Sequence, residues 1–255
     1  MSISISNISF SYSKNQVLKN LSIDIRQGEF IVLAGPNGSG KSTLIKCING
    51  ILQPQSGQIK ISNANIRLYP KNKLAEKLAY VPQNKSVLPD LSVFDTIMLG
   101  RKPYINWRPS TKDLAITAQI IEQLQLESIS MSSINELSGG QQQIVFIGRA
   151  LAQQPDIILL DEPTAHLDIK HTVEIMKLLK TLSAKGLTII VALHDINTAI
   201  RFADRILMLR DGEVFASGGN EIITEKNLEK LYDVKVRILQ EENSFHVIPL
   251  EPIEK

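Results

Sequence analysis

The chain has 255 residues, of which 43% are hydrophobic, and its 28 Lys and Arg against 26 Asp and Glu give a net charge of +2. At about 150 residues per domain this length fits one or two domains, and the composition excludes a disordered or collagen-like chain. The near balance of charge gives no reason to expect nucleic acid as a partner. A single cysteine, Cys47, excludes an internal disulfide and fits a reducing compartment. The apolar stretches fall far short of the roughly 20 residues that span a bilayer, and no signal peptide is apparent at the N-terminus.

The first half of the sequence predicts strands around one short helix. Polar and apolar residues alternate at the start of the chain, and a compact apolar run over 29–34 leads through a glycine-rich loop into a helix from Lys41 to about Asn49. The strands expected from alternation cover 2–10, 21–25 and 58–66. Helical spacing then begins at about Leu91 and continues to Leu126.

The second half returns to strands and helices in alternation. The expected strands are 157–160, 187–193, 206–209 and 213–216, and the expected helices are 169–183 and 225–232. We therefore expect a single α/β domain over 1–255. Its core comprises 1–86 and 152–225, a helical insert covers 87–151, and a short tail covers 226–255.

The glycine-rich loop matches the phosphate-binding pattern G-x-x-x-x-G-K-[ST] and lies between a predicted strand and a predicted helix, as that pattern requires. Its residues are Gly35, Pro36, Asn37, Gly38, Ser39, Gly40, Lys41, Ser42 and Thr43. Glycines let backbone N–H groups turn inward around phosphate oxygens, and the helix N-terminus adds partial positive charge. Lys41 is expected to reach the β- and γ-phosphates, and the Ser42 hydroxyl to bind Mg²⁺. The loop predicts a nucleotide site.

Two acids end the apolar strand at 157–160. Asp161 is placed to hold Mg²⁺ directly or through water, and Glu162 to accept a proton from the water that attacks the γ-phosphate. No guanine-reading [NT]-K-x-D motif occurs, which disfavours a GTPase.

A second candidate anion-binding turn lies in the helical insert. Serine and two glycines precede a helical stretch there, in the order Ser138, Gly139, Gly140 and Gln141. Because the insert carries this turn away from the first loop, it is suited to a nucleotide held by another copy of the chain.

Together these motifs resemble the ATP-binding cassette family over nearly the whole chain. Further family markers follow in order. Tyr12 matches the aromatic residue that stacks on adenine, Gln83 the glutamine loop, 165–168 the D-loop, and His194 the switch histidine that contacts the γ-phosphate.

The resemblance implies a P-loop NTPase core with an antiparallel β subdomain and an inserted helical signature subdomain. It also implies a head-to-tail homodimer that holds two ATP molecules between its subunits. The implied catalytic residues are Lys41, Gln83, Glu162 and His194, with Mg²⁺ held by Ser42, Gln83 and Asp161, and with Ser138 to Gln141 supplied to the partner's ATP.

Two further stretches resemble importers of iron–siderophores, haem and cobalamin, namely Gly100-Arg101-Lys102-Pro103-Tyr104 and the run from His194 to Asp204. This branch implies a permease dimer, an extracytoplasmic substrate-binding protein, and a peripheral position on the cytoplasmic face of the membrane. The permease would dock beside Gln83 and 84–108. There Tyr104 and Trp107 are candidate contacts, with packing inside the subdomain as the other interpretation. A soluble cassette ATPase of a non-transport or export complex, and an importer of an oxyanion such as molybdate, stay open.

Two residues depart from the family pattern. Ile144 stands where relatives often carry arginine, and Ala165 replaces a serine that is common in the D-loop. Neither change removes an expected catalytic group.

Overall fold

A six-stranded sheet forms the centre of the computed structural model, which describes residues 2–83, 90–241 and 244–253. Its strand order is β10-β9-β3-β8-β7-β6, in which β10 is antiparallel to β9 and the other neighbours are parallel. The bounds are β3 Phe30–Ala34, β6 Leu78–Val81, β7 Ile157–Asp161, β8 Thr188–Ala192, β9 Arg205–Arg210 and β10 Glu213–Gly218. The parallel strands place their carboxyl ends at one edge, where such sheets bind ligands.

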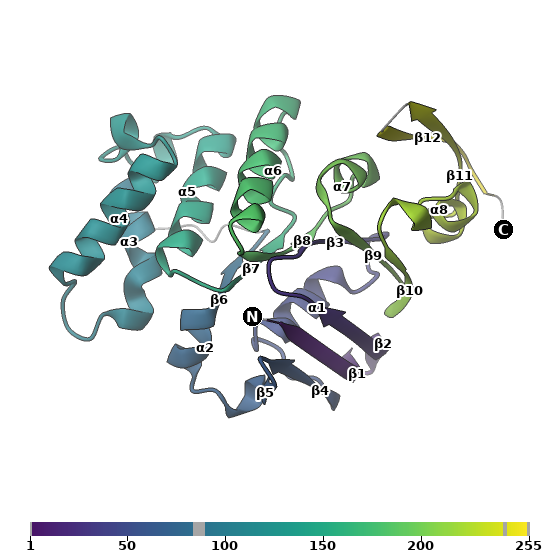
Figure 1. Cartoon of the computed structure of the whole chain (residues 1–255), viewed down its shortest axis with the longest axis horizontal. Helices are drawn as coiled ribbons and strands as arrows, with labels where there is room; N and C mark the ends of the chain where they lie inside the picture. Colours follow the sequence, from purple (N-terminus) through teal and green to yellow (C-terminus); the bar gives the residue numbers. More distant parts are fainter. Residues whose placement is uncertain (1, 84–89, 242–243, 254–255) are drawn as a thin grey trace.

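Each face of this sheet is covered by its own hydrophobic core, and the alternation along β3 shows how. Val32 packs into a core shared with helices α5 (Gly139–Ala152) and α6 (Ile169–Ala184), whereas Ile31 and Leu33 pack on the opposite side. That second core contains α1 (Lys41–Ile48) and the antiparallel sheet seen below the central strands in Figure 1. Strands buried on both faces explain the continuous apolar runs in the sequence.

The antiparallel sheet has the order β2-β1-β4-β5 and is built from the start of the chain. Its strands are β1 Ile3–Tyr12, β2 Asn15–Ile25, β4 Ser56–Ile61 and β5 Ala64–Asn65. The single strand predicted over 58–66 is wrong, because Ser62 (φ 47°) and Asn63 (φ 68°) form a turn between β4 and β5. Two consecutive residues with positive φ are typical of a tight hairpin turn.

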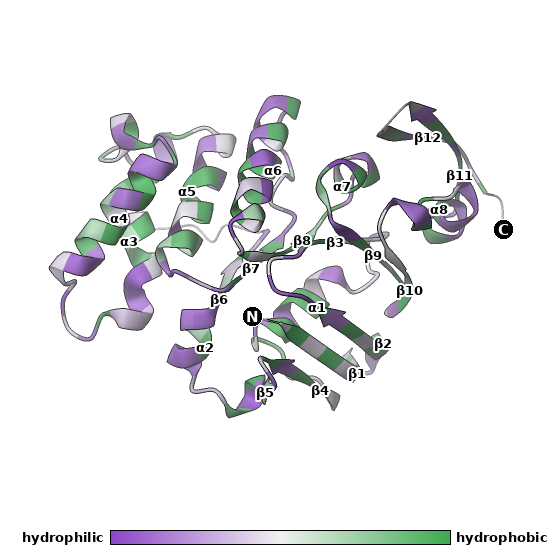
Figure 2. Cartoon of the chain, viewed as in Figure 1, coloured by the Kyte–Doolittle hydropathy of each residue, from purple (hydrophilic) through white to green (hydrophobic). Residues whose placement is uncertain are grey.

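The helical insert contains several short helices rather than one continuous stretch. They are α3 Val93–Met98, a 3₁₀ turn Leu99–Tyr104, α4 Thr111–Gln123, 3₁₀ turns Glu127–Ile129 and Ile134–Glu136, and α5. Ser110 and Asp113 form a capping box that starts α4 afresh after the 3₁₀ turn. Hydrophobic and hydrophilic residues share the surface of these helices (Figure 2), and the apolar face buries Ile116, Ile120 and Ile121 but leaves Leu114 45% exposed.

Residues 226–253, expected as a short tail, form a helix and a hairpin. The predicted helix is α8 Glu225–Tyr232, and it is followed by β11 Val234–Glu241 and β12 Ser244–Pro252, which pair antiparallel. A 3₁₀ turn, Asn220–Ile222, precedes α8, and two further short elements, a 3₁₀ turn Ile66–Leu68 and α2 Lys71–Lys77, join the antiparallel sheet to β6. Within the described ranges, every helix is too short or too polar to cross a membrane.

Candidate active site

The glycine-rich loop joins the end of β3 to the first turn of α1, as the sequence predicts. Two of its glycines are required sterically: a Cβ on Gly35 would lie 2.2 Å from the Leu209 carbonyl oxygen, and one on Gly40 (φ 101°) would lie 2.8 Å from the Leu18 side chain. Such contacts and backbone angles exclude other residues. The loop can therefore wrap closely around a small anion.

Lys41 lies buried beneath this loop. Its Nζ donates to the carbonyl oxygens of Gly35 (2.7 Å) and Pro36 (3.0 Å). Burial lowers the pKa of Lys41, and the nearby carboxylates of Glu162 and Asp161 oppose that shift. Beside it, the buried Ser39 hydroxyl has no hydrogen-bond partner among the residues that the structure describes. A buried cation hydrogen-bonded to carbonyl oxygens, next to an unsatisfied hydroxyl, suits an anionic ligand.

Asp161 ends β7 directly behind the loop. Its Oδ1 accepts a hydrogen bond of 2.7 Å from Ser42 Oγ, and the residue is 3% exposed. Burial raises the pKa of Asp161, while the Ser42 hydrogen bond acts in the opposite direction. A hydroxyl and a carboxylate at this spacing are the hard oxygen donors that Mg²⁺ binds, so the residues present fit that ion.

Glu162 contacts side chains that follow two neighbouring strands, β6 and β8. Gln83 Nε2, two residues after β6, donates to Glu162 Oε2 at 2.6 Å, and His194 Nε2, two residues after β8, lies 2.5 Å from Glu162 Oε1. Because β6, β7 and β8 are adjacent and parallel, their carboxyl ends bring these three side chains together. Glu162 has a φ of 51°, and its side chain is only 11% exposed.

A cavity of about 290 Å³ lies above the loop and collects most of the predicted nucleotide residues. Tyr12 forms part of its wall, 45% exposed, with its ring edge-on to Phe10 at 4.9 Å. The cavity is lined by Tyr12, Asn15, Val17, Asn37, Gly38, Ser39, Gly40, Lys41, Ser42, Thr43, Glu162 and His194. A flat, half-exposed ring beside a phosphate loop can stack on a base.

The second candidate turn lies elsewhere in the chain. Ser138 caps α5 by accepting from the Gln141 backbone, and the Gln141 side chain accepts from the Ser138 backbone in return. Neither of these residues lines the cavity, nor do Gly139 and Gly140. One chain by itself therefore does not unite the two anion-binding turns.

Sequence reasoning missed a histidine that touches this second turn. A Cβ on Gly140 would lie 2.4 Å from the imidazole of His171, so only glycine leaves room for that ring. The ring's Nδ1 lies 2.8 Å from Asp168 Oδ1, and Asp168 also caps α6 by accepting from the His171 backbone. His171 therefore joins the D-loop residue Asp168 to the turn. The sequence signal that could have revealed this contact is a histidine three residues after an Asp that caps a helix.

Side chains of the segment 100–104 contact α4 and the C-terminal end of α5. Arg101 is 2% exposed, pairs with Asp113 at 2.9 Å and donates to the Ala152 carbonyl at 2.8 Å. Tyr104 covers this guanidinium at 4.0 Å and donates to the Gln153 carbonyl at 2.9 Å. Trp107, by contrast, is 88% exposed. Of the expected docking region, 84–89 lies outside the described residues.

Comparison with known proteins finds relatives that are ATP-binding proteins of transport or import systems. The family described as ABC transporter matches residues 18–165. An uncharacterised ABC transporter ATP-binding protein of Methanocaldococcus jannaschii is 43% identical, with 93% of this chain and 94% of that protein covered. A petrobactin import ATP-binding protein of Bacillus subtilis is 37% identical, covering 92% and 94%, and the ferric enterobactin transport ATP-binding protein of Escherichia coli is 32% identical, covering 92% and 88%.

Solved structures agree with these relatives. An inward-facing metal-chelate type ABC transporter has a TM-score of 0.85 at 30% identity, covering 98% of this chain and 97% of that one. A dimeric bacterial ABC transporter cassette has a TM-score of 0.76 at 35% identity, covering 85% and 98%. The similarity to the metal-chelate type transporter extends over nearly the whole chain.

Proposed function

Since this chain belongs to the ATP-binding cassette family of transporter ATPases, we propose that it is the subunit that powers import of a metal chelate, such as an iron–siderophore complex. ATP binding and ATPase activity follow from family membership. The import direction and the chelate class rest on the petrobactin and ferric enterobactin relatives and on the metal-chelate type structure.

The observation that best supports the catalytic assignment is the position of Glu162, held between Gln83 and His194 beside the phosphate-loop cavity. A carboxylate with its two oxygens fixed can accept a proton from an attacking water, as a general base does. Lys41 would exchange its carbonyl partners for phosphate oxygens, and the loop N–H groups would hold the same phosphates.

Ser42, Asp161 and Gln83 are the residues that would hold Mg²⁺. When bound, the ion would neutralise charge on the β- and γ-phosphates. The chain's own part is to orient the nucleotide, hold Glu162 ready for the water proton, and place His194 against the γ-phosphate.

The remaining groups of the site would come from a second copy. Ser138 to Gln141 cap a helix outside the cavity, so in a head-to-tail dimer they would face the partner's ATP. A solved dimeric cassette of related sequence supports this arrangement. The dimer would act on the cytoplasmic face of the membrane beneath a permease dimer that receives cargo from an extracytoplasmic binding protein.

Isolation of the complex tests the transport assignment. A tagged Glu162→Gln chain is expressed in its own cell and purified in mild detergent, and its companions are identified by mass spectrometry. We expect a multi-helix permease whose binding protein takes up a ferric chelate. Recovery without any membrane protein, despite retained ATP binding, would contradict the transport assignment. A binding protein that accepts molybdate instead would contradict the chelate class.

Trp107 offers a sharper test of the docking face. Trp107→Ala is expected to reduce permease recovery while the ATPase rate of the isolated chain stays within about twofold, because an exposed aromatic contributes to an interface and not to the cavity. Leu68→Ala is the matched control, since Leu68 is also an exposed hydrophobic residue, 79% exposed, but lies in one of the short elements that join the antiparallel sheet to β6. Equal permease recovery for both variants would remove Trp107 from the docking face.

A further inference from the structure

The switch histidine, His194, lies directly before a short helix, and the position of that helix determines where the imidazole lies. Asp195 caps α7 (Ile196–Phe202), accepting from the backbone N–H groups of Asn197 at 3.0 Å and Thr198 at 3.2 Å. His194 is the residue just before this cap. Any rotation or shift of α7 therefore moves the imidazole relative to Glu162, which it contacts at 2.5 Å.

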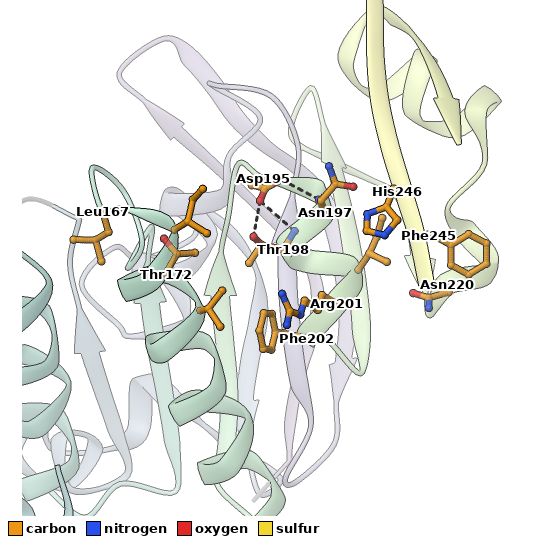
Figure 3. Close-up of a pocket in the computed structure, with 13 residues that line it drawn as sticks. Leu167, Thr172, Asp195, Asn197, Thr198, Arg201, Phe202, Asn220, Phe245 and His246 are labelled. Atoms are coloured by element: carbon orange, nitrogen blue, oxygen red, sulfur yellow. Dashed lines mark hydrogen bonds between the residues drawn. The ribbon is translucent and has the colours of Figure 1, made fainter. Parts of the chain in front are cut away.

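The C-terminal hairpin contacts this helix through one side chain. Val247 donates from its backbone N–H to Asn197 Oδ1 at 2.8 Å, and Asn197 Nδ2 donates to the Val247 carbonyl at 3.1 Å. The amide therefore pairs with both backbone polar groups of one residue, as a neighbouring strand would. Figure 3 shows Asn197 on α7 between Asp195 and the strand that carries His246.

The register of the hairpin explains why those groups are available. Val247 lies opposite Ile238, and the Ile238 N–H donates to Glu225 Oε1 of α8 at 3.0 Å. In an antiparallel pair, alternate residues point their peptide groups away from each other toward the outer edges. Such edges need partners. Glu225 supplies one on the β11 edge and Asn197 supplies the other on the β12 edge, so the hairpin joins α8 to α7.

The hairpin is itself anchored to the core. Arg210, at the end of β9, donates to both carboxylate oxygens of Asp233 at 3.1 Å, and the Asp233 carbonyl accepts from the Ile253 N–H at 2.9 Å. Val236 and Val247 are buried at 7% and 6% exposure. The hairpin therefore offers α7 a fixed support.

One face of α7 packs on the core, where Ala199 is fully buried. Another face borders a cavity of about 710 Å³ that lies between the first turns of α6, α7 and β12, with Thr172 on one side and Arg201 on the other (Figure 3). Its lining includes Asn197 and residues of β12. Close packing is therefore incomplete where α7 meets the hairpin, and the two hydrogen bonds between Asn197 and Val247 join them there.

We propose that Asn197 is a positioning residue for ATP hydrolysis, which holds α7, and through it His194, against the C-terminal hairpin. This inference rests on the role of His194 given under the proposed function. It assigns to β11 and β12 a part in catalysis although both strands begin more than 65 residues beyond the end of the matched family region.

The test compares two amide-to-leucine variants of the full chain. Asn197→Leu removes both hydrogen bonds to Val247. Asn227→Leu, the matched control, removes an amide in α8 that donates to the Ile222 carbonyl at 2.8 Å instead of pairing with the hairpin. We expect kcat of Asn197→Leu to fall about tenfold with KM for ATP within about twofold, because the phosphate loop is untouched. The control keeps both constants.

A spectroscopic measurement separates positioning from general destabilisation. The chain has only four histidines, so its imidazole NMR signals can be resolved and the His194 signal assigned with His194→Ala. Asn197→Leu should shift the His194 signal while Asn227→Leu leaves it in place. Asn197→Asp keeps the acceptor for the Val247 N–H but loses the donor when ionised, so its kcat should lie between those of the wild type and Asn197→Leu.

The outcomes distinguish this inference from the function on which it rests. An unchanged kcat and an unchanged His194 signal in folded Asn197→Leu would overturn the positioning role. Full activity of His194→Ala would instead overturn the catalytic role of His194, whereas loss of activity there with an unaffected Asn197→Leu would overturn only the inference.

Discussion

The phosphate loop and the turn before α5 are both helix N-termini rich in small residues, yet they are built differently. At α1 the cap is Gly40, with no side-chain hydrogen bond, and Lys41 and Ser39, whose buried hydroxyl has no partner among the described residues, line a cavity. At α5 the cap is Ser138, which closes a reciprocal capping box with Gln141. The turn before α1 therefore keeps its polar groups for a ligand bound by the same chain. The turn before α5 caps its own N–H groups, so only its outer surface can face a ligand.

The two turns also differ in why they need glycine. The Gly35 position is closed by a backbone carbonyl, Leu209 O, whereas the Gly140 position is closed by a side chain, the His171 imidazole. The first constraint belongs to the sheet and cannot relax. The constraint at Gly140 depends on the His171 ring, which Asp168 holds in place. It therefore couples the turn to the D-loop rather than to the nucleotide cavity.

The largest effect is expected at the first site. Glu162→Gln should lower the turnover number at least about 100-fold, because it removes the proton acceptor while keeping the side-chain shape. Equilibrium binding of ATP should be retained, since Lys41 and the loop are unchanged. Turnover assays and nucleotide titration measure the two quantities, with Glu174→Gln on the exposed face of α6 as control. Turnover near that of the wild type would exclude Glu162 as the base.

A smaller effect is expected from the second turn, and it separates the two regions. Gly140→Ala pushes against the His171 ring and should lower ATPase activity about tenfold while ATP binding by the single chain stays within about twofold. The double variant Gly140→Ala with His171→Ala makes room for the methyl group and should recover part of the activity. Weakened ATP binding in the single variant would show that the turn acts on the chain's own nucleotide.

The smallest effect concerns the first turn of α4, where Asp113 pairs with Arg101. Asp113 has its pKa lowered from 3.8 to about 2, first by hydrogen bonds from Ser110 and then by Arg101. A carboxylate with a lowered folded-state pKa stabilises the fold above its unfolded pKa, and that stability is lost as pH falls through 3.8 toward 2. Asp113→Asn should therefore cost about 2 kcal/mol in free energy of unfolding at pH 7.

The pH dependence of that difference provides the check. Urea unfolding of Asp113→Asn and the wild type at pH 7, 5 and 3.5 should give a difference that is constant at the upper values and shrinks at the lowest. ATP binding should not change, because Asp113 lies in the insert. A difference that grows as pH falls would contradict the ion pair with Arg101.

Local motifs predicted the phosphate loop and the two acids from the residues alone, because one strand, one turn and one helix place all of them. The convergence of Gln83, Glu162 and His194 depends on the order of three strands that are distant in sequence, and only family resemblance predicted it. The turn at Ser62 and Asn63 was missed because neither is the glycine that usually marks such a turn. The alternation of Val234, Val236 and Ile238 with Lys235 and Arg237 did predict a strand and was overlooked.

The central claim is that one chain holds ATP and a second copy completes the site through its α5 turn. Light scattering coupled to size exclusion tests it most directly, with the Glu162→Gln chain in ATP and in ADP. We predict a dimer in ATP, a monomer in ADP, and a monomer in both when Gly140→Ala is added. A chain that remains a monomer when the ATP concentration is well above its Kd for ATP would contradict the claim.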